Sequence, residues 1–104
     1  MNKIEHIGIA VKNIESAKAI YKSLLGADSY KTEAVESEGV STSFFMCGES
    51  KIELLEATRA DSPIAKFIEK RGEGIHHIAF SVTDIKAETN RLMGEGFIVL
   101  NEEP

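Results

Sequence analysis

Hydrophobic and polar positions alternate along several short stretches of this chain, and helical patterns separate those stretches. Residues 3–11 alternate and are rich in Ile and Val, which predicts a strand. Apolar residues then recur at helical spacing over residues 14–25, between the capping residue Asn13 and the terminating residue Gly26. Three more strands follow, of which the last two form a hairpin: residues 29–35, 41–47 and 51–57. The first half therefore has the order β-α-β-β-β.

The second half returns to the same alternation after a short linking helix. That helix covers about residues 62–71 and begins at Ser62, a capping residue, and Pro63, which suits a first helical turn. The pattern then predicts a strand, a helix and a further strand: residues 75–82, residues 85–93 and the residues after Gly96. The order of the second half is therefore β-α-β.

The two halves are copies of one another. The stretch from His6 to Ile14 returns 71 residues later as the stretch from His77 to Ile85, with a histidine opening the strand and an Asx residue before the helix. This spacing is too long for a solenoid repeat and fits a duplicated supersecondary module. We therefore expect one domain with three parts: a first module over about residues 1–58, a linking helix over about 62–71 and a partial second module over about 74–104.

The second copy is shorter than the first, because it holds no counterpart of about residues 34–57. Without two of its strands, the second module would expose hydrogen-bonding groups and apolar surface on its first strand. We therefore expect either a longer natural chain or an oligomer that completes the sheet.

The composition is that of a domain with a modest hydrophobic core, since 42% of the 104 residues are hydrophobic. No run approaches the roughly 18 to 20 apolar residues of a membrane span, and the net charge of −5 argues against a general nucleic-acid-binding protein. Cys47 is the only cysteine, so no intrachain disulfide can form, and we interpret it as a small buried hydrophobic residue. The N-terminus resembles neither a signal nor a transit peptide, which predicts a cytoplasmic protein.

Strand alternation indicates which residues share a face with each histidine. His6 is expected to lie beside small residues, with the bulky aliphatic residues of its strand packed against the helices, and His77 repeats this arrangement. The residues expected on the histidine faces are Ile4, Gly8 and Ala10 in the first copy and Ala79 and Ser81 in the second. His76 is expected to point away from His77 and to be structural. The two equivalent histidines could therefore meet across a pseudo-twofold axis.

A carboxylate is available for the same site. Glu53 lies in the middle of an apolar strand, on the face opposite Ile52 and Leu54. Burying an acidic side chain there is costly unless a cation or strong donors compensate it. Imidazoles and a carboxylate that meet in a cavity are typical ligands of a divalent metal ion. The sequence therefore predicts a divalent metal site formed by His6, Glu53 and His77.

The strand motifs His6–Val11 and His76–Val82, with Ile52–Leu55 between them, resemble the vicinal oxygen chelate superfamily, which is built from paired βαβββ modules. The segment Asp61–Ile68, followed by Gly74–His77, resembles the methylmalonyl-CoA epimerase family within that superfamily. The resemblance covers nearly the whole chain. It implies an α+β fold with a curved, partly open mixed sheet around a metal cavity.

The resemblance also implies an activity and a set of ligands. Such epimerases interconvert (R)- and (S)-methylmalonyl-CoA by proton abstraction at C2 through an enolate that a metal stabilises, and homodimers are expected. Their metal ligands are two histidines and a Gln or Glu on the fourth strand, which correspond here to His6, His77 and Glu53. A fourth ligand, a glutamate on the last strand, would lie past Pro104. Ligands of these types suit Co, Mn, Ni, Zn or Fe.

The acid–base groups stay unassigned. Some of these epimerases have a glutamate base on the third strand, where this chain has Thr42, a poor general base at neutral pH. Glu36 and Glu38 lie close by and are interpreted as acidic residues on a solvated loop. The residues that bind CoA are not marked by any motif.

Three other functions are compatible with the same residues. A glyoxalase I-type lactoylglutathione lyase also abstracts a proton beside a carbonyl, and a non-haem iron oxygenase also uses two histidines and a carboxylate. A metal-free small-molecule-binding protein of the same fold would keep His6 and His77 as core residues. Substrate, oxygen dependence and bound metal distinguish these functions.

Overall fold

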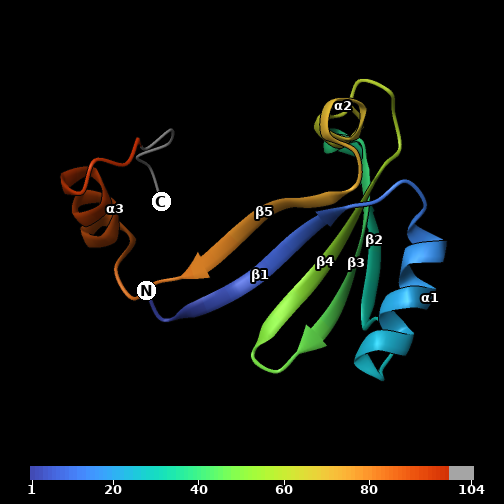
Figure 1. The fold of residues 1–104 in the computed structure, drawn as a ribbon, viewed down its shortest axis with the longest axis horizontal. Helices are drawn as coiled ribbons and strands as arrows, with labels where there is room; N and C mark the ends of the chain where they lie inside the picture. The colour runs from blue at the N-terminus through green and yellow to red at the C-terminus, as the bar shows by residue number, and fades with distance from the viewer. Residues whose placement is uncertain (99–104) are drawn as a thin grey trace.

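The computed structural model of the chain describes residues 1–98. These residues form an α+β fold with one open sheet and three α-helices (Figure 1). The elements follow in the order β1 (Lys3–Ala10), α1 (Ile14–Leu25), β2 (Lys31–Val35), the 3-10 turn η1 (Glu36–Glu38), β3 (Val40–Cys47), β4 (Ser50–Ala57), α2 (Pro63–Arg71), β5 (Gly74–Ser81) and α3 (Ile85–Gly94). The predicted order is confirmed as far as α3. The strand expected after Gly96 falls mainly on residues 99–104, outside the described residues.

Side-chain caps set the beginning of each helix. Asn13 and Asp84, which are repeat counterparts, cap α1 and α3 by accepting hydrogen bonds from the N–H groups of Ser16 and Ala87 at 2.9 and 3.0 Å. Ser62 caps α2 in the same way. The capping predicted from the sequence is therefore confirmed.

The sheet has the strand order β2-β3-β4-β1-β5 among the described residues. It is mixed, because β1 and β4 are parallel whereas the other neighbours are antiparallel. β1 and β5, the first strands of the two modules, pair with a symmetric register, in which His6 is opposite Ala79 and Gly8 is opposite His77. Since Ala79 is the repeat counterpart of Gly8, a pseudo-twofold axis passes between the two strands.

The two faces of the sheet carry different helices. Leu54 belongs to the cluster that packs against α1, and Ile9 of β1 adds to that cluster, as predicted for the bulky residues of this strand. Leu55 packs instead with Ile64 of α2. Because neighbouring strand residues point to opposite sides, α1 and α2 lie on opposite faces of the sheet. The α2 face is also the face of Glu53, two residues before Leu55.

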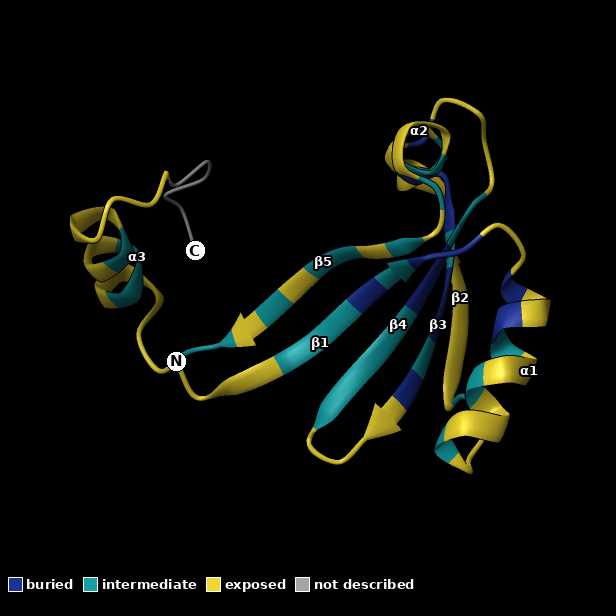
Figure 2. Ribbon diagram, viewed as in Figure 1, coloured by how far each residue is buried: buried dark blue, intermediate teal, exposed yellow. Residues whose placement is uncertain are grey.

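Burial is concentrated where β1, β3 and β4 meet α1 and α2, whereas β5 and α3 are half-buried or exposed (Figure 2). Ile75, Ile78 and Phe80 of β5 keep 59%, 45% and 49% of their surface exposed. α3 lies beyond the sheet (Figure 1), where Glu88 forms an ion pair with the ammonium group of Met1 at 2.9 Å. In the described part of the chain, β5 is therefore an open edge strand with apolar side chains.

The structure also bears on the burial of Cys47 and on membrane-spanning segments. Cys47 is exposed, so the prediction that it is buried was wrong; β3 ends there, beside the hairpin turn that leads to Ser50. No helix within residues 1–98 is long and apolar enough to cross a membrane.

Two β-bulges interrupt the alternation beside the histidines. The register between β1 and β5 shifts between Ile4 and His6 and again between Gly8 and Ile9. Glu5 in β1 and His76 in β5 are the extra residues at these shifts. Glu5 and His76 occupy equivalent repeat positions, so the bulges belong to the duplicated module.

The first bulge corrects one predicted facing. Ile4 pairs with Phe80, whereas His6 pairs with Ala79. Phe80 and Ala79 are consecutive residues of β5 and point to opposite faces. Ile4 therefore lies on the face opposite His6, and the prediction that the two share a face was wrong because Glu5 interrupts the alternation.

Candidate metal centre

His6, Glu53 and His77 converge from three neighbouring strands, β1, β4 and β5. The Nε2 atoms of the two histidines are 3.0 Å apart, and they lie 3.6 Å (His6) and 3.5 Å (His77) from Oε1 of Glu53. The register explains this convergence, because Gly8 pairs with Glu53 on one side and with His77 on the other. All three side chains are partly buried. The structure thus brings together the three residues that the sequence singled out.

The three donor atoms fit one divalent metal ion. A point equidistant from atoms at these separations lies about 2.0 Å from each of them, close to the ~2.0–2.2 Å of Zn–N and Zn–O bonds. Two imidazoles and one carboxylate leave coordination positions open for water or a substrate. The same nitrogen and oxygen donors suit Co, Mn, Ni, Zn and Fe.

Gly8 makes room for one of the two imidazoles. A Cβ atom on Gly8 would lie 2.2 Å from Cε1 and 2.7 Å from Nε2 of His77, far inside normal contact distance. The ring of His77 therefore lies across the backbone of β1, in the space that a side chain at position 8 would take. The small residues beside the histidines were expected to leave space for another group, and here that group is His77.

A carboxylate orients His6. Oε1 of Glu5 lies 2.9 Å from Nδ1 of His6, and its Oε2 lies 3.1 Å from Nζ of Lys51. The hydrogen bond with His6, and after it that with Lys51, lowers the pKa of Glu5, so the carboxylate is ionised and can only accept. The proton of a neutral His6 then lies on Nδ1, which leaves the lone pair of Nε2 free for a metal.

His76 supports His77 from the second bulge. The prediction that His76 points away from His77 was wrong, because the bulge inserts His76 as an extra residue and places it beside its neighbour. Its Nδ1 lies 2.9 Å from Nδ1 of His77, and its ring packs edge-on against Phe67 of α2, with centroids 4.9 Å apart. A His77 that ligates through Nε2 carries its proton on Nδ1 and can donate it to His76.

The surroundings favour the neutral forms of both Glu53 and His77. Burial is the main cause that raises the pKa of Glu53; His6 opposes this effect, and the charges of nearby carboxylates add to it. Burial also lowers the pKa of His77, with further contributions from His6 and His76. A neutral imidazole can ligate a metal, and a bound cation would favour the ionised form of Glu53. The electrostatics therefore suit a cation at this point.

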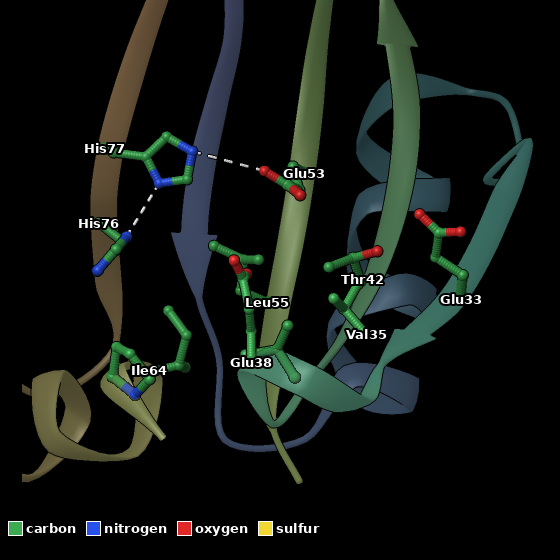
Figure 3. A pocket seen from close by; sticks show the side chains of 11 residues that line it. Glu33, Val35, Glu38, Thr42, Glu53, Leu55, Ile64, His76 and His77 are labelled. Carbon is green, nitrogen blue, oxygen red and sulfur yellow. Dashed lines mark hydrogen bonds and ion pairs between the residues drawn. The ribbon is translucent and has the colours of Figure 1, made fainter. Parts of the chain in front are cut away.

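A pocket of about 310 Å³ opens beside these side chains (Figure 3). Its lining combines apolar and titratable side chains, the first group being Val35, Val40, Leu55, Pro63 and Ile64 and the second Glu33, Glu38, Glu53, His76 and His77. The pocket therefore has an apolar wall at α2 next to two of the three candidate ligands.

Thr42 lies in the same pocket, on β3. It is 4% exposed, and its hydroxyl has no hydrogen-bond partner among the described residues. Glu38 lines the pocket from η1, so the interpretation of this residue as part of a solvated loop was incomplete: its side chain is exposed but faces the site. Thr42 is uncharged, whereas Glu38 brings a carboxylate to the pocket.

Four titratable side chains of the site were not anticipated from the sequence: Glu5, His76, Glu33 and Glu38. A signal for the first two was present, since each directly precedes the histidine of its copy. The bulges that turn them toward the site could not be inferred from alternation, which assumes an unbroken strand. Nothing in the local sequence distinguishes Glu38 from Glu36.

Residues 5–104 match the glyoxalase/bleomycin resistance protein/dioxygenase superfamily. The uncharacterized protein YqjC of Bacillus subtilis is 38% identical over 104 residues, which cover 100% of this chain and 74% of that protein. The ethylmalonyl-CoA/methylmalonyl-CoA epimerase of Cereibacter sphaeroides is 40% identical over 101 residues, which cover 96% of this chain and 75% of that protein. The chain spans 59% of the length of the human mitochondrial methylmalonyl-CoA epimerase, to which it is 38% identical over 99% of its own length.

The fold agrees with these matches. A variant of the Streptomyces coelicolor methylmalonyl-CoA epimerase, solved in complex with 2-nitronate-propionyl-CoA, superimposes with a TM-score of 0.80 and 34% sequence identity over 100% of this chain and 76% of that one. The open mixed sheet with its three helices is thus the fold of these epimerases. The chain belongs to the glyoxalase/bleomycin resistance protein/dioxygenase superfamily and, within it, to the methylmalonyl-CoA epimerase family.

Proposed function

We propose that this protein is a methylmalonyl-CoA epimerase, which interconverts the (R) and (S) forms by removing and returning the proton at C2. The observation that supports this function most strongly is the convergence of His6, Glu53 and His77 beside a pocket with an apolar wall. The epimerases among the relatives support an acyl-CoA thioester as the substrate.

In this proposal His6, Glu53 and His77 hold one divalent metal ion. When bound, the metal would polarise the thioester carbonyl and stabilise the negative charge that develops as C2 loses its proton. Glu53 balances part of the cation's charge, while Glu5 and His76 keep the two imidazoles turned toward one point.

The pocket side chains hold the acyl part of the substrate. Leu55 and Ile64 are 6% and 4% exposed and form an apolar surface that suits the methyl branch at C2. Their packing also keeps water from the carbon that ionises, which strengthens electrostatic interactions in the site. A substrate without the branch leaves this surface uncovered, so a methyl substituent is favoured.

We also propose that the chain acts as one domain over residues 1–104, in the cytoplasm and as a homodimer. The single cysteine is compatible with a reducing compartment, and the open apolar strand β5 offers surface to a second subunit. Sedimentation equilibrium at micromolar concentration tests the dimer; a monomeric mass would contradict it.

The test of the activity combines metal analysis with proton exchange. Protein loaded with excess divalent metal is dialysed and its bound metal is quantified, and exchange of the C2 proton of methylmalonyl-CoA is followed by NMR in D₂O. We expect metal and exchange in the wild type and the loss of both in His77→Ala and Glu53→Ala, each of which removes a donor atom. Glu49→Ala, which makes the same change in the exposed hairpin turn, is the control and should retain both.

The outcomes separate the alternatives. Metal without exchange would contradict the epimerase and favour glyoxalase-type chemistry, or an oxygenase if iron and oxygen are required. A wild type that takes up no metal would favour a metal-free binding protein of the same fold.

A further inference from the structure

Epimerisation at C2 needs a proton acceptor that is not already engaged, a requirement that rests on the proposed function. Of the described residues that line the pocket, five carry titratable side chains. Glu53 and His77 belong to the candidate metal centre, and Nδ1 of His76 contacts Nδ1 of His77. Two carboxylates remain, those of Glu33 and Glu38.

Glu38 is the better placed of the two. The carboxylate of Glu33 lies on the outermost strand β2, where Oε1 is 3.5 Å from Nζ of Lys31. The side chain of Glu38 extends from η1 into the pocket (Figure 3). The carboxylate of Glu33 is therefore held toward Lys31, whereas that of Glu38 faces the pocket.

The turn that carries Glu38 is held in place by the segment before α2. Arg59 donates a hydrogen bond through Nη1 to the carbonyl of Glu36, and the N–H of Thr58 donates to the carbonyl of Gly39 at 2.7 Å. Gly39 adopts a left-handed conformation with φ +65°, and a Cβ there would lie 3.0 Å from Cζ of Arg59. Glu38 thus extends from a fixed turn, as a proton acceptor requires.

We infer that Glu38 is the carboxylate that exchanges a proton with one face of C2. Its carboxylate takes the C2 proton, the electron pair of the broken C–H bond moves onto the thioester oxygen, and Glu38 becomes a neutral carboxylic acid. In the reverse step the acid returns the proton to the same face, and the electron pair returns to carbon. A group on the opposite face completes the inversion.

The experiment compares Glu38→Gln with Glu36→Gln, which removes the same charge from the same turn but from a side chain outside the pocket lining, and with Glu33→Gln. Each metal-loaded variant is assayed for bound metal, thermal midpoint, kcat and KM for epimerisation of methylmalonyl-CoA. We expect Glu38→Gln to lower kcat by about 10²–10⁴-fold. Its metal content, thermal midpoint and KM should stay close to wild type, Glu38→Asp should recover part of the rate, and Glu36→Gln should match wild type.

The outcomes distinguish the role of Glu38 from the proposed function. A Glu38→Gln variant with wild-type kcat, or a larger loss in Glu33→Gln, would overturn the role of Glu38 while the epimerase stands. Loss of kcat together with metal or thermal midpoint would also overturn it, because it indicates a structural role. A wild type that does not exchange the C2 proton would overturn the proposed function itself, and the role of Glu38 with it.

Discussion

The substitution Gly8→Ala should weaken metal binding without disturbing the fold. The added Cβ would lie 2.2 Å from Cε1 of His77, whereas carbon atoms in contact are about 3.5–4.0 Å apart, so the ring has to move by at least about 1.3 Å. Metal–ligand distances tolerate only about 0.2 Å. His77 therefore cannot keep both its place beside the new methyl group and its bond to a shared metal.

Gly8→Ala should reduce the affinity for the metal much more than the stability of the metal-free protein. We expect the metal Kd to rise by about 10–100-fold, which corresponds to about 1.4–2.7 kcal/mol. The metal-free variant should stay within about 1 kcal/mol of wild type, because the imidazole of His77 is 37% exposed and can swing outward while alanine is the better strand residue. Chelator competition measures the first quantity, and urea unfolding in excess chelator measures the second.

Two controls isolate the contact between Gly8 and His77. Gly94→Ala makes the same chemical change where a Cβ meets no atom within 4 Å, and it should leave the metal Kd unchanged. In a His77→Ala background, which is expected to bind no metal, Gly8→Ala should not lower the free energy of unfolding in excess chelator, since the clashing ring is gone. A Gly8→Ala protein that binds metal as tightly as wild type would refute the placement of His77 across β1.

Glu53→Leu should raise the thermal midpoint of the metal-free protein, since it replaces a partly buried carboxylate by an apolar side chain. Because leucine offers no donor atom, this variant should lose most of the gain of about 2.7 kcal/mol that wild type shows at metal concentrations of about 100 Kd. Burial lowers the pKa of His77, so the imidazole binds a proton more tightly in the unfolded chain than in the folded one. The free energy of unfolding of the metal-free protein should therefore decrease as the pH falls from about 6.5 toward the lowered pKa. His77→Asn should weaken this pH dependence, as measured by urea unfolding at a series of pH values. Leu54→Ala should cost about 2–5 kcal/mol in free energy of unfolding, because Leu54 is fully buried, whereas Leu24→Ala at a 71% exposed position should change it by less than about 0.5 kcal/mol.

The sequence predicts most of the fold because its local signals agree with one another. Asn13, Ser62 and Asp84 cap the helices that the apolar periodicity predicts, and alternation locates all five described strands to within two residues. The duplication adds a long-range restraint, since it requires that β1 and β5 be equivalent. Their symmetric pairing in the sheet agrees with that requirement.

Two of the wrong predictions arise from the two bulges. Alternation assigns His76 to the wrong side and places Ile4 beside His6, and both errors arise where one strand gains an extra residue relative to its partner. A bulge is a property of a strand pair, so a single strand examined alone does not reveal it. Glu38 is missed for a similar reason, because its approach to the site depends on how Arg59 and Thr58 hold its turn.

The asymmetry between the two copies is as important to the site as their symmetry. A strict twofold arrangement would place His77 over Gly8 and His6 over the repeat counterpart of Gly8. That counterpart, however, is Ala79, which has a side chain. His77 can therefore lie across its partner strand, whereas His6 cannot, and the two rings meet at 88° with centroids 5.1 Å apart. This difference allows the Nε2 atoms of both histidines to approach Oε1 of Glu53. Glu53 lies on β4, which borders the β1–β5 pair on one side only. The duplication thus brings two histidines together, and the difference between Gly8 and Ala79 orients them toward one common point.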